Sequence, residues 1–195
     1  LVIRALGYLC SARHGLADDE ILEVLSRDAD VMEAFRRRSP KSPPTDRLPD
    51  IVWSRLFFDL EPYLTEREAS GGPTWSFFHQ QIGGLIAERV CGGDEALRRH
   101  RHLADYFLDQ PVRRGRDDRS LNLRRLGELP WHLARARDWA GLTELVTDWA
   151  FLEAQVSANG PAAAVADLDL ALEGRDALTE ADVAALEHLR STLKL

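Results

Sequence analysis

The chain contains little cysteine. Its 195 residues include two, Cys10 and Cys91, which form neither a Cys-x-x-Cys pair nor a cluster with histidine. This scarcity leaves a disulfide framework or a zinc finger without support. It is typical of a protein from a reducing compartment, so we predict a cytoplasmic location.

Long hydrophobic runs are also lacking. No apolar stretch approaches the roughly 20 residues that cross a bilayer as a helix, so we predict no membrane partner. The opening residues, LVIRALGYLCSA, carry Arg4 among apolar residues at helical spacing, which indicates an amphipathic helix rather than a signal peptide. Because the chain starts inside that pattern without a methionine, we expect it to be a piece of a longer protein.

Sequence motifs for catalysis are missing. A P-loop needs Gly-x-x-x-x-Gly-Lys-Ser/Thr, and the chain has no Gly-Lys dipeptide. Gly83-Gly84 lacks phosphate-cradle spacing, and we expect it to mark close backbone packing in a helix, where each glycine costs about 1 kcal/mol. No Ser-His-Asp or Cys-His arrangement follows from the spacing. We predict that this chain is not an enzyme and holds no cofactor by itself.

The histidines do not predict a metal site. His100 and His102 form a His-x-His pair, but on a helix they point to different faces and no carboxylate or cysteine pattern completes a site. His100 is three residues from both Leu97 and Leu103, so we expect a half-buried structural role. His132, beside Trp131, is expected to pack or cap.

Charge is distributed unevenly along the chain. The formal net charge is -7. Residues 111–137 hold eight arginines against three carboxylates, whereas residues 138–195 hold eleven carboxylates against three basic side chains. The acidic C-terminal part would repel nucleic acid.

The first half of the chain predicts three helices, a hairpin and a fourth helix. Helical spacing opens the chain, Gly15 indicates a left-handed stop, and the acidic run from Asp18 suits the first turn of a second helix. Residues 36–49 contain four prolines and predict a loop. A third helix follows Pro49, residues 63–78 predict two strands around Ser-Gly-Gly-Pro, and helical spacing resumes after His79. This order is that of a winged-helix domain, assigned to residues 1–93.

Residues 94–195 predict an all-α domain of helical hairpins, similar to a repeat protein. An aspartate, Asp94, is expected to cap its first helix. The segments DWAGLTELV and DWAFLEAQV echo each other ten residues apart and indicate two helices capped by Asp138 and Asp148. Thr179 and Asp182 are spaced like a capping box before a last helix. The predicted fold class is therefore mainly α: a winged helix with a small hairpin, then a helical domain.

DNA binding is not expected. The third helix, which would enter a groove, carries Arg55 against Asp50, Asp59 and Glu61, and we expect it to be buried. The other arginine-rich stretches, residues 36–38 and those after Pro111, fall in predicted loops. Two alternatives stay open: a winged-helix transcription regulator with a helical ligand or dimerisation domain, and a helical scaffold that binds a partner peptide.

Several segments together resemble a known family. The quoted runs are ALGYLCSARHGLADDEILEVL, VWSRLFFDLEPYL, WSFFHQQIGGLIAERV, RRHRHLADYFLDQP and LGELPWHLARARDWAGLTELVTD. Their order and spacing resemble the segment that follows the nucleotide-binding core in STAND-class signalling ATPases of the NACHT type. The resemblance extends from Leu1 to about Gly160.

The resemblance implies a function and one site residue. The family combines an ATPase core, a winged helix, a helical segment and C-terminal sensor repeats, so the core and the repeats are the implied partners. In this family a histidine after two hydrophobic residues contacts the β-phosphate of ADP held by the core. FFH matches at Phe77, Phe78 and His79. His79 is thus the implied cofactor-binding residue, with ADP or ATP belonging to the parent protein. The sequence after His79 departs from the aromatic run that is common in the family.

Overall fold

The computed structural model describes residues 1–41, 43–69, 71–78, 83–84, 86, 88–89, 92–114 and 120–194. These residues form ten α-helices, two short 3-10 helices and two small antiparallel hairpins. The predicted class, mainly α with a small hairpin, is confirmed.

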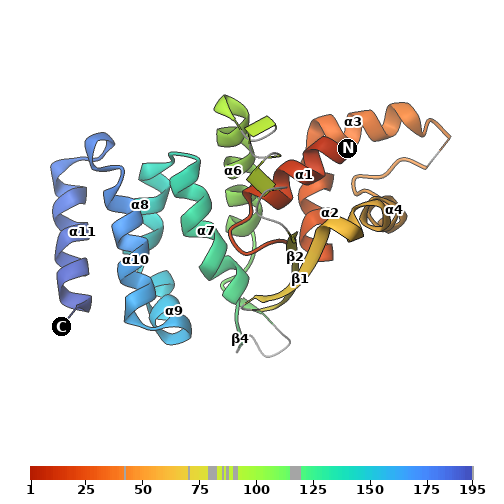
Figure 1. Ribbon diagram of the computed structural model, residues 1–195. Coiled ribbons are helices and arrows are strands. Elements are labelled where there is room, and N and C mark those ends of the chain that lie inside the picture. Colours follow the sequence, from red (N-terminus) through yellow and green to blue (C-terminus); the bar gives the residue numbers. More distant parts are fainter. Residues whose placement is uncertain are drawn as a thin grey trace. The chain divides into compact units, whose positions relative to one another are not determined.

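The chain divides into two compact units (Figure 1). Unit 1 is Leu1–Leu103 and unit 2 is Ala104–Leu195. The division falls inside helix α6 (Gly93–Leu108), later than the boundary predicted after residue 93. The reason is that the N-terminal part of α6 packs with the elements of unit 1.

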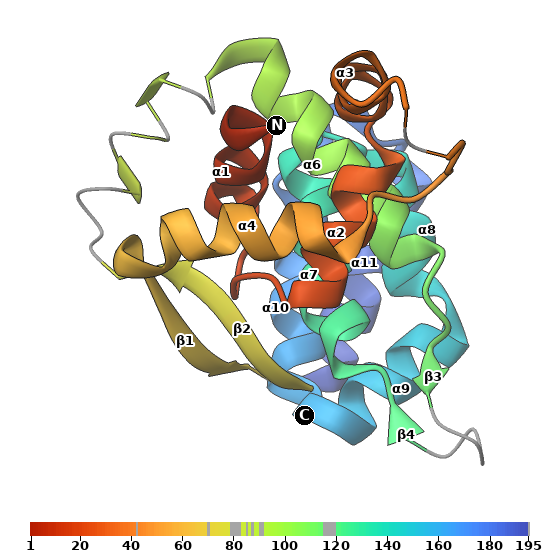
Figure 2. The ribbon, with the colours of Figure 1, turned by 90° about the vertical axis from the view of Figure 1, so that its right-hand side faces the viewer.

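Unit 1 begins with four helices and a hairpin. These elements are α1 (Val2–Ser11), α2 (Asp18–Arg27), α3 (Ala29–Arg38), α4 (Asp50–Leu60), η1 (Glu61–Tyr63), β1 (Leu64–Ala69) and β2 (Gly72–Phe77). The strands pair in register from Leu64↔Phe77 to Ala69↔Gly72, as the turn residues predicted. Strand β2 packs against α1, and Figure 2 shows the hairpin extending from the end of α4.

Helix α3 was not predicted. Asp28 caps it, because its side chain accepts hydrogen bonds from the backbone N–H of Asp30 and of Val31. The proline-rich loop therefore starts only after Arg38, and residues 36–38 form the last turn of a helix rather than a loop. Three basic side chains at that end suit the helix dipole.

Helix α4 begins directly after Pro49 and ends before Pro62, as expected. Its predicted burial is wrong. Trp53, Leu56 and Leu60 are buried, but Ile51 is 57% exposed and Phe58 is 76% exposed. The apolar residues of α4 extend around more of the helix than the face that packs on the core.

The helix predicted after His79 lies largely outside the described residues. Gly83 and Gly84 are helical, and the carbonyl of Gly83 accepts a hydrogen bond from Cys10 Sγ at 3.4 Å. A Cβ on Gly83 would make ordinary contact with Phe77 at 3.8 Å, and one on Gly84 would meet nothing within 4 Å. The expectation that this pair marks close backbone packing is therefore wrong.

Unit 2 is a stack of helices. After the end of α6 come β3 (Arg113–Arg114), β4 (Ser120–Leu121), α7 (Leu123–Arg135), α8 (Trp139–Thr147), α9 (Trp149–Asn159), α10 (Pro161–Leu172), η2 (Arg175–Ala177) and α11 (Glu180–Leu193). Helix α10 contacts α7, α8, α9 and α11 (Figure 1). The two-residue pair β3–β4 interrupts a segment that was predicted to have no strands.

Three of the four helix caps predicted after residue 93 are confirmed. Asp138 accepts from the Gly141 N–H and Asp148 from the Phe151 N–H, so the echoed segments are successive helices. Thr179 and Asp182 form the capping box. Asp94 instead lies within the first turn of α6, which begins at Gly93.

Each unit has its own apolar core. Fully buried side chains of unit 1 include Leu16, Ile21, Val24, Leu25 and Leu103. Those of unit 2 include Phe107, Leu126, Leu129, Leu142, Leu168 and Leu186. Among the described residues, no helix combines the length and apolar character needed to span a bilayer.

Candidate functional site

The candidate site is the end of strand β2, which leads into His79. His79 itself lies outside the described residues. The two residues before it are described: Phe77 ends β2, and the Phe78 N–H donates to the Tyr63 carbonyl at 2.9 Å. The Phe78 side chain is 60% exposed. The backbone that enters the predicted site is therefore tied to η1.

Strand β2 is anchored to the loop between α1 and α2. Trp75 N–H donates to the Leu16 carbonyl at 2.8 Å, and Leu16 N–H donates to the Trp75 carbonyl at 3.1 Å. The fully buried Thr74 adds a hydroxyl hydrogen bond of 2.6 Å to the His14 carbonyl. Leu16 thus acts as a one-residue third strand on the hairpin.

Gly15 makes this anchorage possible. Its φ is +77°, and a Cβ on it would lie 2.4 Å from the Trp75 carbonyl oxygen. The left-handed conformation was predicted as a helix stop, but α1 already ends at Ser11. Position 15 therefore requires glycine for two reasons: its backbone is left-handed, and strand β2 passes too close for a side chain.

Asp18 joins three elements of unit 1. Its Oδ1 accepts the indole N–H of Trp53 in α4 at 2.7 Å and that of Trp75 in β2 at 3.1 Å. The Phe57 and Trp75 rings lie 4.6 Å apart between centroids. One carboxylate on the first turn of α2 therefore positions both α4 and the hairpin.

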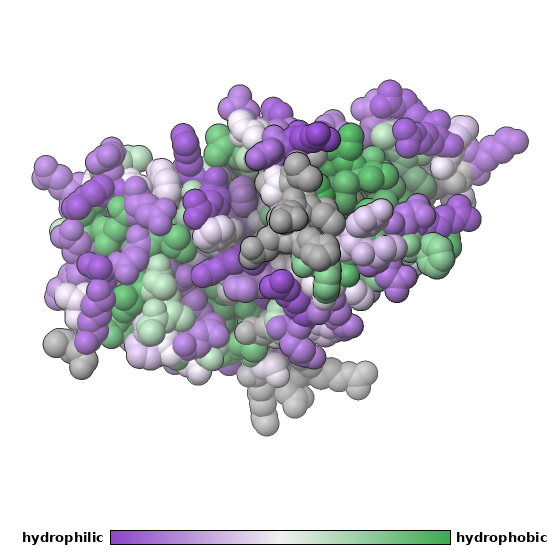
Figure 3. Space-filling view, viewed as in Figure 1, coloured by the Kyte–Doolittle hydropathy of each residue, from purple (hydrophilic) through white to green (hydrophobic). Residues whose placement is uncertain are grey.

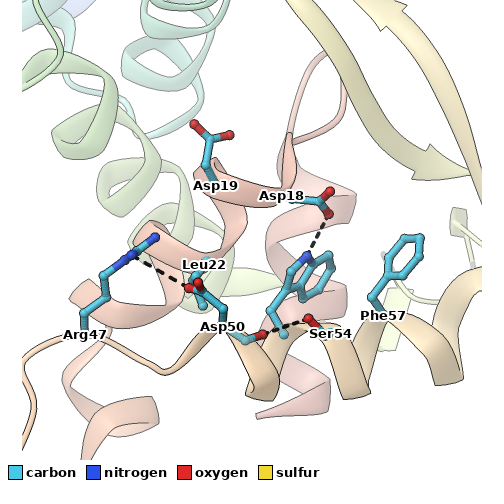
Figure 4. Close-up of a pocket in the computed structure, with 8 residues that line it drawn as sticks. Asp18, Asp19, Leu22, Arg47, Asp50, Ser54 and Phe57 are labelled. Atoms are coloured by element: carbon cyan, nitrogen blue, oxygen red, sulfur yellow. Dashed lines mark hydrogen bonds and ion pairs between the residues drawn. The ribbon is translucent and has the colours of Figure 1, made fainter.

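A pocket of about 370 Å³ opens beside this carboxylate (Figure 4). Asp18, Asp19 and Asp50 line it together with Arg47, which is 3.8 Å from Asp50. Three carboxylates against one arginine would repel phosphate. The pocket therefore does not suit a nucleotide, and its aromatic and acidic lining serves to hold α2 against α4.

A second polar cluster joins α1, α3 and α6. Tyr8 donates to Asp28 Oδ2 at 2.8 Å, and Arg4 Nη1 lies 2.7 Å from Glu95 Oε1. Burial first, and then the Asp28 carboxylate, raise the pKa of Tyr8 above its ordinary value. Burial opposes ionisation of Glu95, but a hydrogen bond from Arg98 and the neighbouring arginines outweigh it, so the pKa of Glu95 is lowered.

Arg99 is the most buried cation of this cluster. It is 2% exposed, and its Nη2 lies 3.2 Å from Glu95 Oε1. Its Nε and Nη1 have no hydrogen-bond partner among the described residues. Gly7 leaves room for it, since a Cβ there would lie 2.5 Å from Nε.

The histidines weighed in the sequence take structural positions. His102 Nε2 lies 3.0 Å from the Val24 carbonyl, and its ring stands 5.5 Å from that of Tyr8. His100 is half-buried. Within the described part of the chain, no group of three or more histidine, cysteine, aspartate or glutamate side chains is placed to hold a metal ion.

Unit 2 contains a buried polar ladder that sequence reasoning missed. Glu128 pairs with Arg124 and with His132, each at 3.2 Å, and all three side chains are buried. The Phe107 ring stacks on His132 at 5.9 Å. The signal was the spacing i, i+4, i+8, which aligns the three on one face of α7.

Some arginines after Pro111 are used inside unit 2. Arg124 pairs with Glu128, and Arg125 Nη1 donates to the Gln110 carbonyl at 2.6 Å. Burial lowers the pKa of Arg125. These two side chains therefore do not contribute to an exposed basic surface.

Comparison with known proteins places the chain among relatives of one kind. It is 33% identical over 159 residues to human "NACHT domain- and WD repeat-containing protein 1", covering 68% of this chain and 10% of that protein. The mouse protein of that name is 32% identical over 162 residues, covering 70% of the chain and 10% of that protein. Human "NACHT and WD repeat domain-containing protein 2" is 38% identical over 112 residues, covering 55% and 6%.

The chain is thus homologous to NACHT and WD repeat-containing proteins and spans about a tenth of the length of the first two. No family model matches the chain. No solved structure matches it either.

Proposed function

We propose that this chain is a non-catalytic regulatory segment of a NACHT-type ATPase. It couples the nucleotide state of an ATPase core to sensor repeats and to oligomerisation, and moves as a body against that core. The observation that carries the proposal is homology to proteins whose names include both a NACHT domain and WD repeats. The ADP or ATP belongs to the core of the parent protein.

The anchored hairpin supports a role in transmission. Four helices precede the hairpin, where the winged-helix prediction had three, and the described residues at 83–84, 86 and 88–89 after it are helical. The Leu16–Trp75 bridge and the Asp18 hydrogen bonds tie β2 to α1, α2 and α4. A displacement at the end of β2 is therefore passed to the helices rather than absorbed by a loose loop.

His79 is proposed as the contact to the ADP β-phosphate. It follows Phe78 directly at the exit of β2. An imidazole N–H near a helix N-terminus stabilises a terminal phosphate by a hydrogen bond and by the dipole. Such a contact exists only in the closed, ADP-bound state, so it biases the switch toward that state.

The parent protein provides the test. His79→Ala removes a hydrogen bond to a charged group, worth about 1.5 to 3 kcal/mol, so ADP dissociation should accelerate about tenfold to a hundredfold. The matched control is His188→Ala in α11, because that residue is exposed and its ring makes no hydrogen bond among the described residues. An unchanged ADP dissociation rate in His79→Ala would exclude the phosphate contact.

The isolated 195-residue chain gives an independent check. Because it lacks a P-loop motif, it should neither hydrolyse ATP nor bind ADP tightly. Calorimetric titration with ADP measures this directly. Submicromolar affinity would contradict the assignment of the nucleotide site to an absent core.

A further inference from the structure

An apolar groove lies on unit 1 between the first turn of α1, helix α3 and helix α4. Its volume is about 320 Å³. The apolar side chains lining it include Val2, Val31, Phe35, Val52 and Leu56. In the space-filling view, hydrophobic surface gathers around the start of α1 and beside α3 (Figure 3).

Exposed apolar residues extend this surface. Val2 is 49% exposed and Ile3 is 65% exposed in the first turn of α1. On α4, Ile51 and Phe58 are exposed and lie seven residues apart, on a stripe that passes Arg55. Exposed large apolar side chains beside an apolar groove are a feature of interaction sites.

Two arginines whose side chains have no partner among the described residues border the groove. Arg38 ends α3, and Arg55 lies in the middle of α4. Within the described part of the chain, neither guanidinium group makes a hydrogen bond or an ion pair. Asp59 is the one carboxylate among the described lining residues. The neighbouring Arg37 pairs loosely with Glu33 at 3.8 Å.

We propose that this groove binds an acidic amphipathic helix of a partner protein. Apolar side chains at helical spacing would occupy the floor formed by Phe35, Val52 and Leu56. Carboxylates flanking that stripe would pair with Arg38 and Arg55, whose guanidinium groups offer forked donors. Nucleic acid is a poorer occupant, because the floor is apolar and Asp59 faces the same space.

This inference does not depend on the nucleotide role of the chain. The groove is built from α1, α3 and α4, whereas the proposed phosphate contact follows β2. The result of a binding experiment on the groove is therefore independent of whether the parent protein retains ADP through His79.

The test uses the 195-residue chain and two synthetic probes. Each is a fluorescein-labelled helical peptide of about 20 residues, with leucines at i, i+4, i+7 and i+11. Glutamates flank the stripe in one peptide and lysines in the other. Fluorescence polarisation at physiological salt should show the acidic peptide binding about tenfold more tightly than the lysine peptide.

Charge reversal locates the site. Arg38→Glu with Arg55→Glu should weaken the acidic peptide about tenfold or more and strengthen the lysine peptide. Arg37→Glu is the matched control: it makes the same change one residue away, outside the groove lining, and should leave both affinities within about twofold. Ala34→Trp, which fills the groove, should abolish binding of both peptides. If that variant misfolds by circular dichroism, the exposed arginine pair still decides the question.

Three outcomes would overturn the proposal. One is the absence of acidic-peptide binding, and another is equal binding of the two peptides. The third is a concentration-dependent dimer in analytical ultracentrifugation that is lost in the Arg38→Glu, Arg55→Glu variant, because a second copy of the chain would then occupy the groove.

Discussion

Unit 1 and unit 2 are both mainly helical, yet the side-chain hydrogen bonds that hold them join residues at different separations. In unit 1, Thr74 reaches a carbonyl 60 residues away, and Trp75 reaches Asp18 across 57 residues. In unit 2, the buried ladder of α7 joins residues four apart. Its capping aspartates bond three residues ahead.

This difference indicates how each unit should respond to the loss of a single hydrogen bond. Local hydrogen bonds stabilise one helix at a time, so their loss is felt first in that helix. The bonds of unit 1 form only when the hairpin meets α1, α2 and α4, so the loss of one loosens several elements. Unit 2 also has side-chain bonds of longer range: Gln155 reaches Leu126 and Asp167, and Arg125 reaches the Gln110 carbonyl.

The largest expected effect lies in unit 2, at Glu128. Glu128→Ala leaves Arg124 and His132 buried without their carboxylate partner, which should reduce the free energy of unfolding by about 3–5 kcal/mol. Urea denaturation measures the loss, and amide hydrogen exchange assigns it to α7. Glu187→Ala is the control, because its ion pair with Arg175 is exposed and should be worth less than about 1 kcal/mol. Equal losses in the two variants would contradict the importance of the ladder.

Gly15→Ala should give the next largest effect and act on unit 1. The left-handed φ costs about 1–2 kcal/mol, and the new Cβ would displace the Trp75 carbonyl, so we expect about 2–4 kcal/mol in total. Gly93→Ala separates the two causes: Gly93 has φ +60°, but nothing lies within 4 Å of a Cβ there. Chemical denaturation should show the smaller loss in Gly93→Ala. If both variants lose the same free energy of unfolding, the close approach of β2 does not contribute to the need for glycine at position 15.

Tyr8→Phe tests the second polar cluster with a smaller change. It removes the hydroxyl that donates to the buried Asp28, which should cost about 1–2 kcal/mol. Tyr63→Phe is the matched control, because Tyr63 is 51% exposed. Thermal unfolding should show a lower midpoint for Tyr8→Phe alone. An unchanged midpoint would mean that water replaces the hydroxyl at Asp28.

The smallest expected effect is a pH dependence at Glu95. Since its folded pKa is lowered, its contribution to stability is present above the ordinary glutamate pKa, near 4.3, and is lost as the pH falls through the lowered folded pKa. Glu95→Gln should therefore be less stable than the wild type at pH 7, and the gap should narrow at pH 3. Urea midpoints at both pH values measure it. A gap that is constant with pH would show that ionisation of Glu95 does not contribute.

Local features of the fold could be predicted because they depend on neighbours in the chain. The caps Asp138, Asp148 and Thr179 act on N–H groups three residues ahead. The hairpin follows from alternation around Gly71, whose φ is +106°. Helix α3 is the exception: Asp28, Val31, Met32 and Phe35 carry its cap and apolar spacing, but it is short and leads directly into four prolines, which by themselves favour a loop.

The sequence predicted the candidate site only through the position of His79 in the Phe-Phe-His motif. Residues Phe77 and Phe78 are placed by the structure, whereas His79 and its role in sensing stay a prediction. That α4 exposes Ile51 and Phe58 could not be read from its composition, since spacing shows which residues share a face but not which face finds a partner.

By itself the sequence determined where the helices capped by Asp138, Asp148 and Thr179 begin, that a hairpin precedes His79, and that the chain lacks a P-loop motif of its own. Those properties arise from torsion preferences, caps and residue types within a few positions. Tertiary structure decided that one carboxylate, Asp18, holds two indoles and that Gly15 must admit β2. It also brought α1, α3 and α4 together around an apolar groove. These contacts join residues tens of positions apart, and the free energy that selects them comes from packing, which no local pattern encodes.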